Sequence, residues 1–123
     1  LVTDRGTTFG YNNLIADMRG LTQIREFAPV CFDATHAVQY PGTEAGASGG
    51  DRTLVSALSR AATATGIDAL FVEAHPNPDE APCDGPSQLD FDALDALLSE
   101  VVAIDRALSQ IPEDVRRRAR CEL

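Results

Sequence analysis

The chain has 123 residues, of which 44% are hydrophobic, 24% charged and 6% aromatic, and this ordinary globular composition excludes a fibrous or low-complexity protein. Its 19 acidic residues against 10 basic ones give a formal charge of -9, which predicts that it binds neither nucleic acid nor an anionic membrane surface. Every basic residue is an arginine, so this chain alone cannot supply a catalytic lysine.

Three cysteines, Cys31, Cys83 and Cys121, form no C-x-x-C pair. An odd set without paired spacing argues against a zinc ribbon or a disulfide framework and suits a reducing, cytoplasmic setting. No apolar run approaches the roughly 20 residues that a membrane-spanning helix needs. We therefore expect a soluble protein in the cytoplasm.

The first predicted elements are the end of a strand at residues 1–3 and a helix at about 14–27. Apolar residues recur with helical spacing across that helix, and Asn12 or Asn13 is its expected N-cap. The run 30–35 is short, apolar and β-branched before it turns polar, which predicts a buried parallel strand.

Residues 39–50 are mostly Gly, Ala, Ser, Thr and Pro, which predicts a mobile loop, and a lid over an active site is one interpretation of it. Helical spacing returns after this loop, with Ser48 or Asp51 as cap candidates and Gly66 where a C-terminal glycine belongs. A second buried strand is predicted at 69–72.

Four prolines between residues 76 and 86 exclude regular structure there. Asp90 then caps a predicted helix over 91–108, which Pro112 ends. The arginine-rich residues that follow, 112–123, predict a solvated tail.

The alternation of strand and helix predicts an α/β fold with a parallel sheet. A closed barrel of this kind needs eight βα units and typically about 250 residues, so three units would form only part of one. A small open doubly wound sheet is the alternative, although no glycine-rich nucleotide loop follows any strand. Residues 1–123 are thus expected to be one partial domain.

Polar side chains follow each predicted strand. The carboxyl ends of parallel strands form the functional face of such folds, because the loops that leave them converge. Each residue alone also has an ordinary structural explanation, but together they indicate a site. They are Asp4, Arg5, Asp33, Thr35, His36, Glu73 and His75.

His36, Glu73 and Asp84 offer one imidazole and two carboxylates, which suit a divalent metal such as Mn, Fe or Zn. Without a metal, the same groups could orient a hydroxylated substrate and move a proton. Arg5 offers a planar fork for a phosphate or carboxylate, or else a salt bridge with Asp4 or Glu73.

Four runs carry a family resemblance: RGTTFGYNN at 5–13, FDATH at 32–36, FVEAHP at 71–76 and CDGP at 83–86. In this order they resemble the C-terminal part of the 3-deoxy-D-manno-octulosonate 8-phosphate synthases, also called 2-dehydro-3-deoxyphosphooctonate aldolases. The match runs in register over about residues 1–108. It implies a (β/α)8 TIM barrel, of which this chain would supply about strands six to eight with their helices.

The resemblance implies an aldol-type transferase that condenses phosphoenolpyruvate with D-arabinose 5-phosphate and releases phosphate. The product is 3-deoxy-D-manno-octulosonate 8-phosphate, a precursor of lipopolysaccharide. Family members are commonly homo-tetramers. The family's lysines lie on earlier strands, so we expect this chain alone to be an inactive fragment.

By the same resemblance, Arg5 would hold the phosphate of phosphoenolpyruvate and His36 would lie beside the reacting aldehyde. Glu73 and Asp84 would complete a metal or water site. Asn12, Asn13 and Asp33 would support substrate binding. Asp4 departs from the family's usual glutamate, which would shift its partner slightly.

The family has metal-requiring and metal-free branches, which differ chiefly by a Cys or an Asn on the first strand. The run 83–86 resembles the metal-free branch, so the expected cofactor is none. A divalent Mn, Fe or Zn held by His36, Glu73 and Asp84 is the alternative.

Three other functions stay open. The sister heptulosonate phosphate synthases share the phosphoenolpyruvate chemistry, although the run 9–13 favours the octulosonate enzymes. A metal-dependent hydrolase would use His75 together with His36, Glu73 and Asp84. A non-catalytic half-barrel interaction module would have to cover two open sheet edges.

Overall fold

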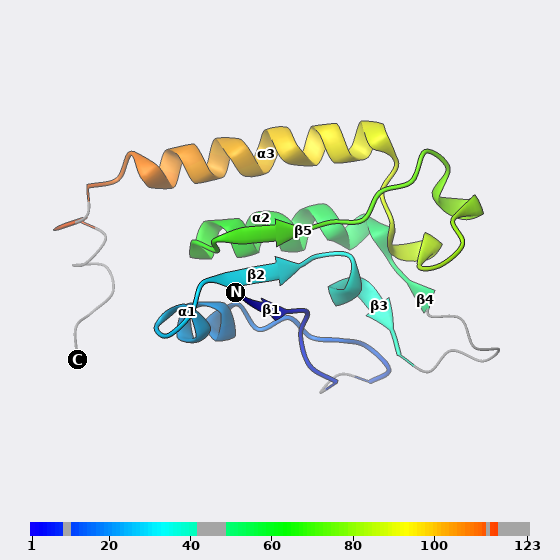
Figure 1. Ribbon diagram of the computed structural model, residues 1–123, viewed down its shortest axis with the longest axis horizontal. Helices are drawn as coiled ribbons and strands as arrows, with labels where there is room; N and C mark the ends of the chain where they lie inside the picture. The colour runs from blue at the N-terminus through cyan, green and yellow to red at the C-terminus, as the bar shows by residue number, and fades with distance from the viewer. Residues whose placement is uncertain (9–10, 42–48, 113, 116–123) are drawn as a thin grey trace.

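A computed structural model describes residues 1–8, 11–41, 49–112 and 114–115. Its main elements alternate strictly between strand and helix, which confirms the predicted α/β order (Figure 1). In chain order they are β1 (Val2–Asp4), α1 (Met18–Arg25), β2 (Val30–Asp33), α2 (Val55–Thr65), β5 (Ala69–Phe71) and α3 (Phe91–Ser109).

Strand β2 is the centre of a three-stranded parallel sheet with the order β1-β2-β5. Val30 lies opposite Val2, and Cys31 lies opposite Ala69. All four residues of β2 are buried, which explains why this strand is apolar without alternation until Asp33. The predicted parallel sheet is confirmed.

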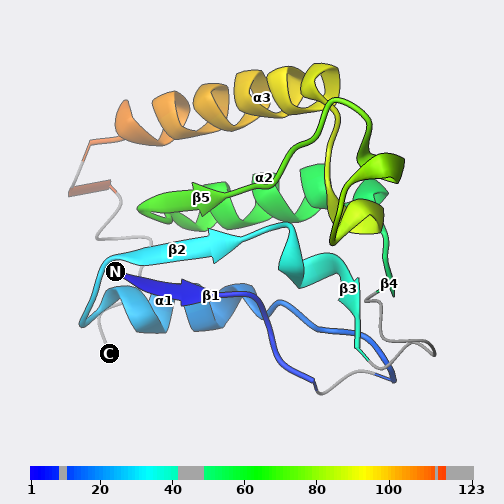
Figure 2. The ribbon, with the colours of Figure 1, turned by 45° about the vertical axis from the view of Figure 1, so that its right-hand side comes forward.

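The three helices pack against the sheet, with α2 running behind it between α1 and α3 (Figures 1 and 2). Val30 and Phe32 point into the core that the sheet shares with these helices. Because side chains alternate along a strand, Cys31 and Asp33 point to the other face. No helix among the described residues is long and apolar enough to cross a membrane. The core includes Leu21, Val30, Phe32, Val55, Ala62, Leu97 and Val101.

The predicted start of the first helix at residue 14 is wrong. Helix α1 begins at Met18, and its N-cap is Asp17, whose carboxylate accepts a hydrogen bond from the backbone N–H of Arg19 at 3.0 Å. Ile15 instead forms two backbone hydrogen bonds with Thr7, of 2.9 and 3.0 Å. This pairing removes residues 14–16 from the helix, and Asn12, with a φ of 55°, occupies a turn.

Other predicted helix ends are confirmed. Gly66 ends α2 with a left-handed φ of 90°. Asp90 caps α3 by accepting from the backbone N–H of Ala93 at 2.7 Å. Asp51 caps the short 3₁₀ turn Arg52–Leu54 that leads into α2.

Within the predicted loop, β3 (Gln39–Tyr40) pairs with β4 (Gly49–Gly50) in an antiparallel ribbon. Residues 42–48 lie outside the described residues, as do 113 and 116–123 of the predicted tail. The mobility of the loop and the solvation of the tail therefore stay predictions.

Candidate functional site

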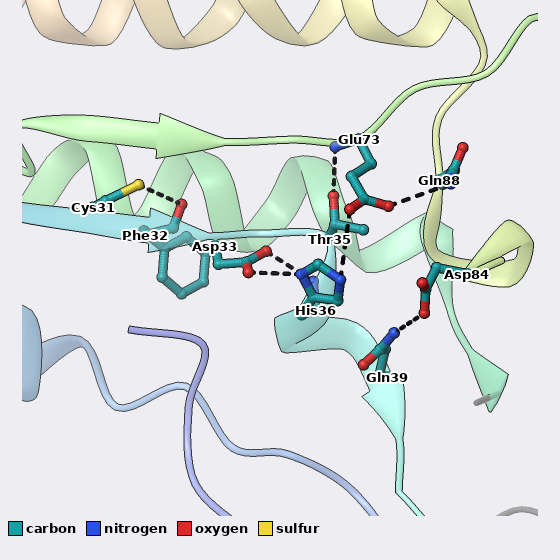
Figure 3. Close-up of polar contacts among 9 residues, drawn as sticks. All are labelled: Cys31, Phe32, Asp33, Thr35, His36, Gln39, Glu73, Asp84 and Gln88. Carbon is teal, nitrogen blue, oxygen red and sulfur yellow. Dashed lines mark hydrogen bonds and ion pairs between the residues drawn. The ribbon is translucent and has the colours of Figure 1, made fainter. Parts of the chain in front are cut away.

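Three predicted site residues meet beyond the carboxyl ends of β2 and β5 (Figure 3). His36 begins a 3₁₀ turn just after β2, Glu73 lies two residues after β5, and Asp84 belongs to the proline-rich segment. One ligand atom from each lies within 4.8 Å of the others, and all three side chains are partly buried. His36 and Glu73 were predicted as site residues because each follows the end of a predicted strand.

Asp33 fixes the orientation of His36. Its Oδ1 accepts the backbone N–H of His36 at 3.0 Å, and its Oδ2 lies 2.7 Å from the ring Nδ1. A carboxylate at Nδ1 favours the tautomer protonated there, which leaves the Nε2 lone pair free. Nε2 lies 3.6 Å from Glu73 Oε1, so the imidazole points into the carboxylate cluster.

Glu73 is held through its backbone and its side chain. Its backbone N–H donates to the hydroxyl of the fully buried Thr35 at 2.7 Å. Its Oε2 accepts from Gln88 Nε2 at 3.3 Å, while that same amide nitrogen donates to the carbonyl of Cys83 at 3.1 Å. These contacts leave Glu73 Oε1 facing His36.

Asp84 has a left-handed backbone, with a φ of 53°. Its Oδ1 accepts from Gln39 Nε2, and its carbonyl accepts from the backbone N–H of Ser87 at 2.9 Å. The same carboxylate, next to Cys83 in the chain, raises the pKa of the Cys83 thiol above its usual value. The Cys83 thiol therefore stays protonated at neutral pH.

The predicted substrate-binding residue Arg5 lies at the carboxyl end of β1, the same edge of the sheet. Asp4 Oδ2 accepts the backbone N–H of Gly6 at 3.3 Å and shapes the turn that carries Arg5. Across the described residues Arg5 is exposed and forms no salt bridge, so the alternative pairing with Asp4 or Glu73 is not observed. That Arg5 binds a phosphate or carboxylate of the substrate stays a prediction.

Two further residues lie apart from the cluster. Asn12 is exposed in its turn, and its predicted role in substrate binding is untested. His75 Nδ1 lies 2.7 Å from the carbonyl of Asn77, so a local turn occupies the nitrogen. This geometry gives no support to a hydrolase that uses His75 as a ligand.

Three neighbours of the cluster were not predicted from sequence. Phe71 stacks on His36 with 5.9 Å between ring centroids and 24° between ring planes. Gln39 contacts Asp84 across 45 positions of sequence, and Arg52 contacts the segment around Asp84. No motif signals such contacts, because only the folded chain brings these residues to the site.

One imidazole nitrogen and two carboxylate oxygens at this spacing form a suitable donor set for a divalent cation such as Mn, Fe or Zn. Asp33 accepts a hydrogen bond from His36, and Gln39 and Gln88 donate to the two carboxylates; these contacts orient the three groups, as outer-shell partners do around metal ligands. Without a cation, the same cluster can hold a water and exchange a proton with it.

Comparison with known proteins identifies the family of this chain. The model of the DAHP synthetase I family matches residues 1–110. The chain belongs to this family. Among solved structures, it resembles phospho-2-dehydro-3-deoxyheptonate aldolase (DAHP synthase) from Thermotoga maritima, with a TM-score of 0.72 and 34% identity over 86% of this chain and 29% of that one. A truncated form of 3-deoxy-D-arabino-heptulosonate 7-phosphate synthase from the same organism gives the same values over 38% of its length.

Curated relatives within the family are named 2-dehydro-3-deoxyphosphooctonate aldolase. That of Syntrophotalea carbinolica is 58% identical over 106 residues, which are 85% of this chain and 38% of the relative. Those of Geobacter sulfurreducens and Burkholderia mallei are 56% and 51% identical over 85% and 91% of this chain, and 39% and 40% of their own lengths. The predicted resemblance is confirmed, and the chain spans about two fifths of the length of these relatives.

Proposed function

We propose that these residues serve the condensation of phosphoenolpyruvate with D-arabinose 5-phosphate, as part of a polypeptide of the relatives' length. The observation that carries the proposal is the identity of 51–58% with curated 2-dehydro-3-deoxyphosphooctonate aldolases. The reaction joins the methylene carbon of phosphoenolpyruvate to the aldehyde carbon of the sugar, adds water and releases phosphate. Its product is 3-deoxy-D-manno-octulosonate 8-phosphate, a lipopolysaccharide precursor.

In that protein, residues 1–110 would form the last three βα units of a (β/α)8 barrel. The parallel order β1-β2-β5 supports this placement, as does the cover of helices against the sheet. The cluster at the carboxyl ends of the strands also fits, because active sites of such barrels lie there. The assembly would be a homo-tetramer in the cytoplasm.

Each residue has a proposed role that follows from its chemistry. Arg5 binds the phosphate of phosphoenolpyruvate through its planar guanidinium. His36, whose ring is oriented by Asp33, lies beside the reacting aldehyde. Glu73 and Asp84 hold the attacking water, and Asn12 helps to bind substrate.

The donor set of His36, Glu73 and Asp84 fits a divalent cation, which when bound would act as a Lewis acid on a substrate oxygen. The run 83–86 resembles the metal-free branch of the family, however. We therefore propose that the reaction needs no metal. Manganese, iron or zinc at the three side chains is the alternative.

A chimera tests the proposed activity. This chain replaces the matching segment of the Geobacter sulfurreducens aldolase, to which it is 56% identical over 106 residues. We expect the chimera to release inorganic phosphate from phosphoenolpyruvate when arabinose 5-phosphate is present, and a His36→Ala version to lose this release. A folded chimera that releases no phosphate with any sugar would contradict the proposal.

A heptulosonate phosphate synthase is the second candidate, because the solved structures that match are named DAHP synthases. Their 34% identity is well below the 51–58% shared with the curated octulosonate aldolases, which favours the latter. The same chimera decides between them. Phosphate release with erythrose 4-phosphate in place of arabinose 5-phosphate would favour the second candidate.

A further inference from the structure

Arg52 connects the start of α2 to the segment that carries Asp84. Its Nη2 donates to Asp79 Oδ1 at 2.6 Å and to the carbonyl of Gly85 at 3.0 Å. The two acceptors lie on either side of Asp84, one in the 3₁₀ turn Pro78–Glu80 and the other in Gly85–Ser87. One guanidinium nitrogen therefore links both ends of the segment 78–87, called the Asp84 loop below.

The Asp84 loop needs such support, since its only regular structure is those two short turns. Asp84 itself has a φ of 53° and a ψ of 17°, a left-handed conformation that costs free energy in a residue with a Cβ. Surrounding contacts must therefore hold it. The carbonyl that Arg52 binds belongs to Gly85, the next residue along the chain.

The backbone beside Arg52 packs closely against the Asp84 loop, and the two turns of the loop pack closely against each other. A Cβ at Gly50 would collide with the hydroxyl of Ser87, and a Cβ at Gly85 would collide with the carbonyl of Pro78. The segment 50–52 thus contacts the Asp84 loop both through the backbone of β4 and through the Arg52 side chain.

Charge also singles out Arg52. Glu73, Asp79 and Asp84 place three carboxylates around this end of the sheet. Within the described part of the chain, the salt bridge of Arg52 is the one that brings an arginine to the Asp84 loop. The Arg52 side chain is 34% exposed and that of Asp79 is 81% exposed, so solvent screens this ion pair, whereas the contact of Arg52 with the Gly85 carbonyl is partly buried.

We propose that Arg52 is a positioning residue, which fastens both ends of the Asp84 loop and so keeps the Asp84 carboxylate in reach of His36 and Glu73. The geometric claim stands on this chain alone. Its kinetic consequence rests on the proposed function.

The Cys83 thiol reports on the loop without any assay of activity. Cys83 is exposed and precedes Asp84 in the loop, whereas Cys31 is buried. In the full 123-residue chain with Cys121→Ser, we expect Arg52→Ala to raise the rate of reaction with Ellman's reagent several-fold, because a loop that is no longer fastened at both ends lets the reagent approach Cys83 more freely. Arg52→Lys, which retains one charged donor, should give an intermediate rate.

Arg60→Ala is the matched control. Arg60 lies on α2, the helix that follows the 3₁₀ turn of Arg52, and its guanidinium pairs with Glu100 at 2.7 Å, away from the Asp84 loop. Its removal takes away the same charge and should leave the thiol rate unchanged. If Arg52→Ala fails to fold by circular dichroism, Asp79→Asn tests the same link, because it weakens one contact at an 81% exposed side chain.

The kinetics of the chimera give a second test of the role of Arg52. Because a loosened Asp84 loop would misplace one carboxylate of the cluster, we expect Arg52→Ala to lower kcat by about tenfold or more. Arg52→Lys should recover part of kcat, and Arg60→Ala should match the parent. Thiol and kinetic values for Arg52→Ala equal to those of Arg60→Ala would overturn the proposal. An inactive parent chimera would instead overturn the proposed function, and the thiol rates would still decide the role of Arg52.

Discussion

Asp33 is the residue on which the orientation of His36 depends, since it accepts from both the backbone and the ring of that histidine. In the chimera we expect Asp33→Asn to lower kcat by about 10–100-fold, because an amide cannot stabilise the Nδ1 proton as a carboxylate does. Phosphate release measures this loss. Asp17→Asn, which changes an exposed carboxylate paired with Arg19, should leave kcat unchanged. Equal rates for the two variants would contradict the role of Asp33.

The carboxylates of Glu73 and Asp84 each already accept a hydrogen bond from a glutamine amide. Such donors stabilise ionised carboxylates without a metal. Together with the sequence of the 83–86 run, this leads us to expect that the chimera retains its rate of phosphate release after dialysis against EDTA. Loss of activity that manganese restores would refute this prediction and favour the metal-binding alternative.

His36 and Glu73 could be predicted from sequence because each follows a recognisable strand, and Asp84 was predicted with them as the second carboxylate of one donor set. Gln39 and Arg52 could not be predicted. The first meets Asp84 across 45 positions, and the second meets Asp79 and Gly85 across 27 and 33 positions. Polar residues in loops are common, and only the fold distinguishes those that reach a site.

At the scale of elements, Asp68 ties together the ends of α1, β2 and β5 that lie opposite the site. Its Oδ2 accepts the backbone N–H of Val30 at 2.8 Å, and Arg25 donates to its carboxylate at 2.9 and 3.1 Å. The hydrogen bond from Val30 and the Arg25 guanidinium lower the pKa of Asp68 below 3.8. Its ionised form therefore stabilises the fold.

This linkage predicts a pH dependence of stability. A lowered pKa in the folded state means that the contribution is present above the unfolded pKa and is lost as the pH falls through the folded one. We expect Asp68→Asn to lower the free energy of unfolding by about 1 kcal/mol near neutrality and by less near pH 3. Urea unfolding of the full chain at both pH values measures this. Asp105→Asn on the exposed side of α3 is the control, and a cost for Asp68→Asn that is unchanged at low pH would contradict the prediction.

Helix α3 shows what local sequence can predict. Its cap Asp90 and its apolar stripe are both local signals, and the predicted range 91–108 is within one residue of the observed Phe91–Ser109. The start of α1 could not be predicted in the same way. There the pairing of Ile15 with Thr7 overrides a helical pattern, and no window confined to residues 14–27 contains Thr7.

At the scale of the whole molecule, the sheet has β1 and β5 at its two edges, beside apolar side chains exposed to solvent. Leu1 is 75% exposed, Val2 38% and Phe71 41%. In a closed barrel, further strands would pair with these edges and cover such residues. The interaction-module alternative must cover them with a second copy or another protein.

The difference between this open sheet and a closed barrel leads to the last prediction, which concerns the purified 123-residue chain without added segments. We expect it to release no phosphate from phosphoenolpyruvate and arabinose 5-phosphate, because it contains no lysine and its described residues carry the ends of three parallel strands, where a closed barrel has eight. The chimera at equal molar concentration is the positive control, and sedimentation shows whether copies of the chain associate. Phosphate release by the chain alone, lost on His36→Ala, would mean that these three units build a working site among themselves. If the chain alone releases no phosphate while the chimera does, the His36 cluster acts only when other strands complete the sheet.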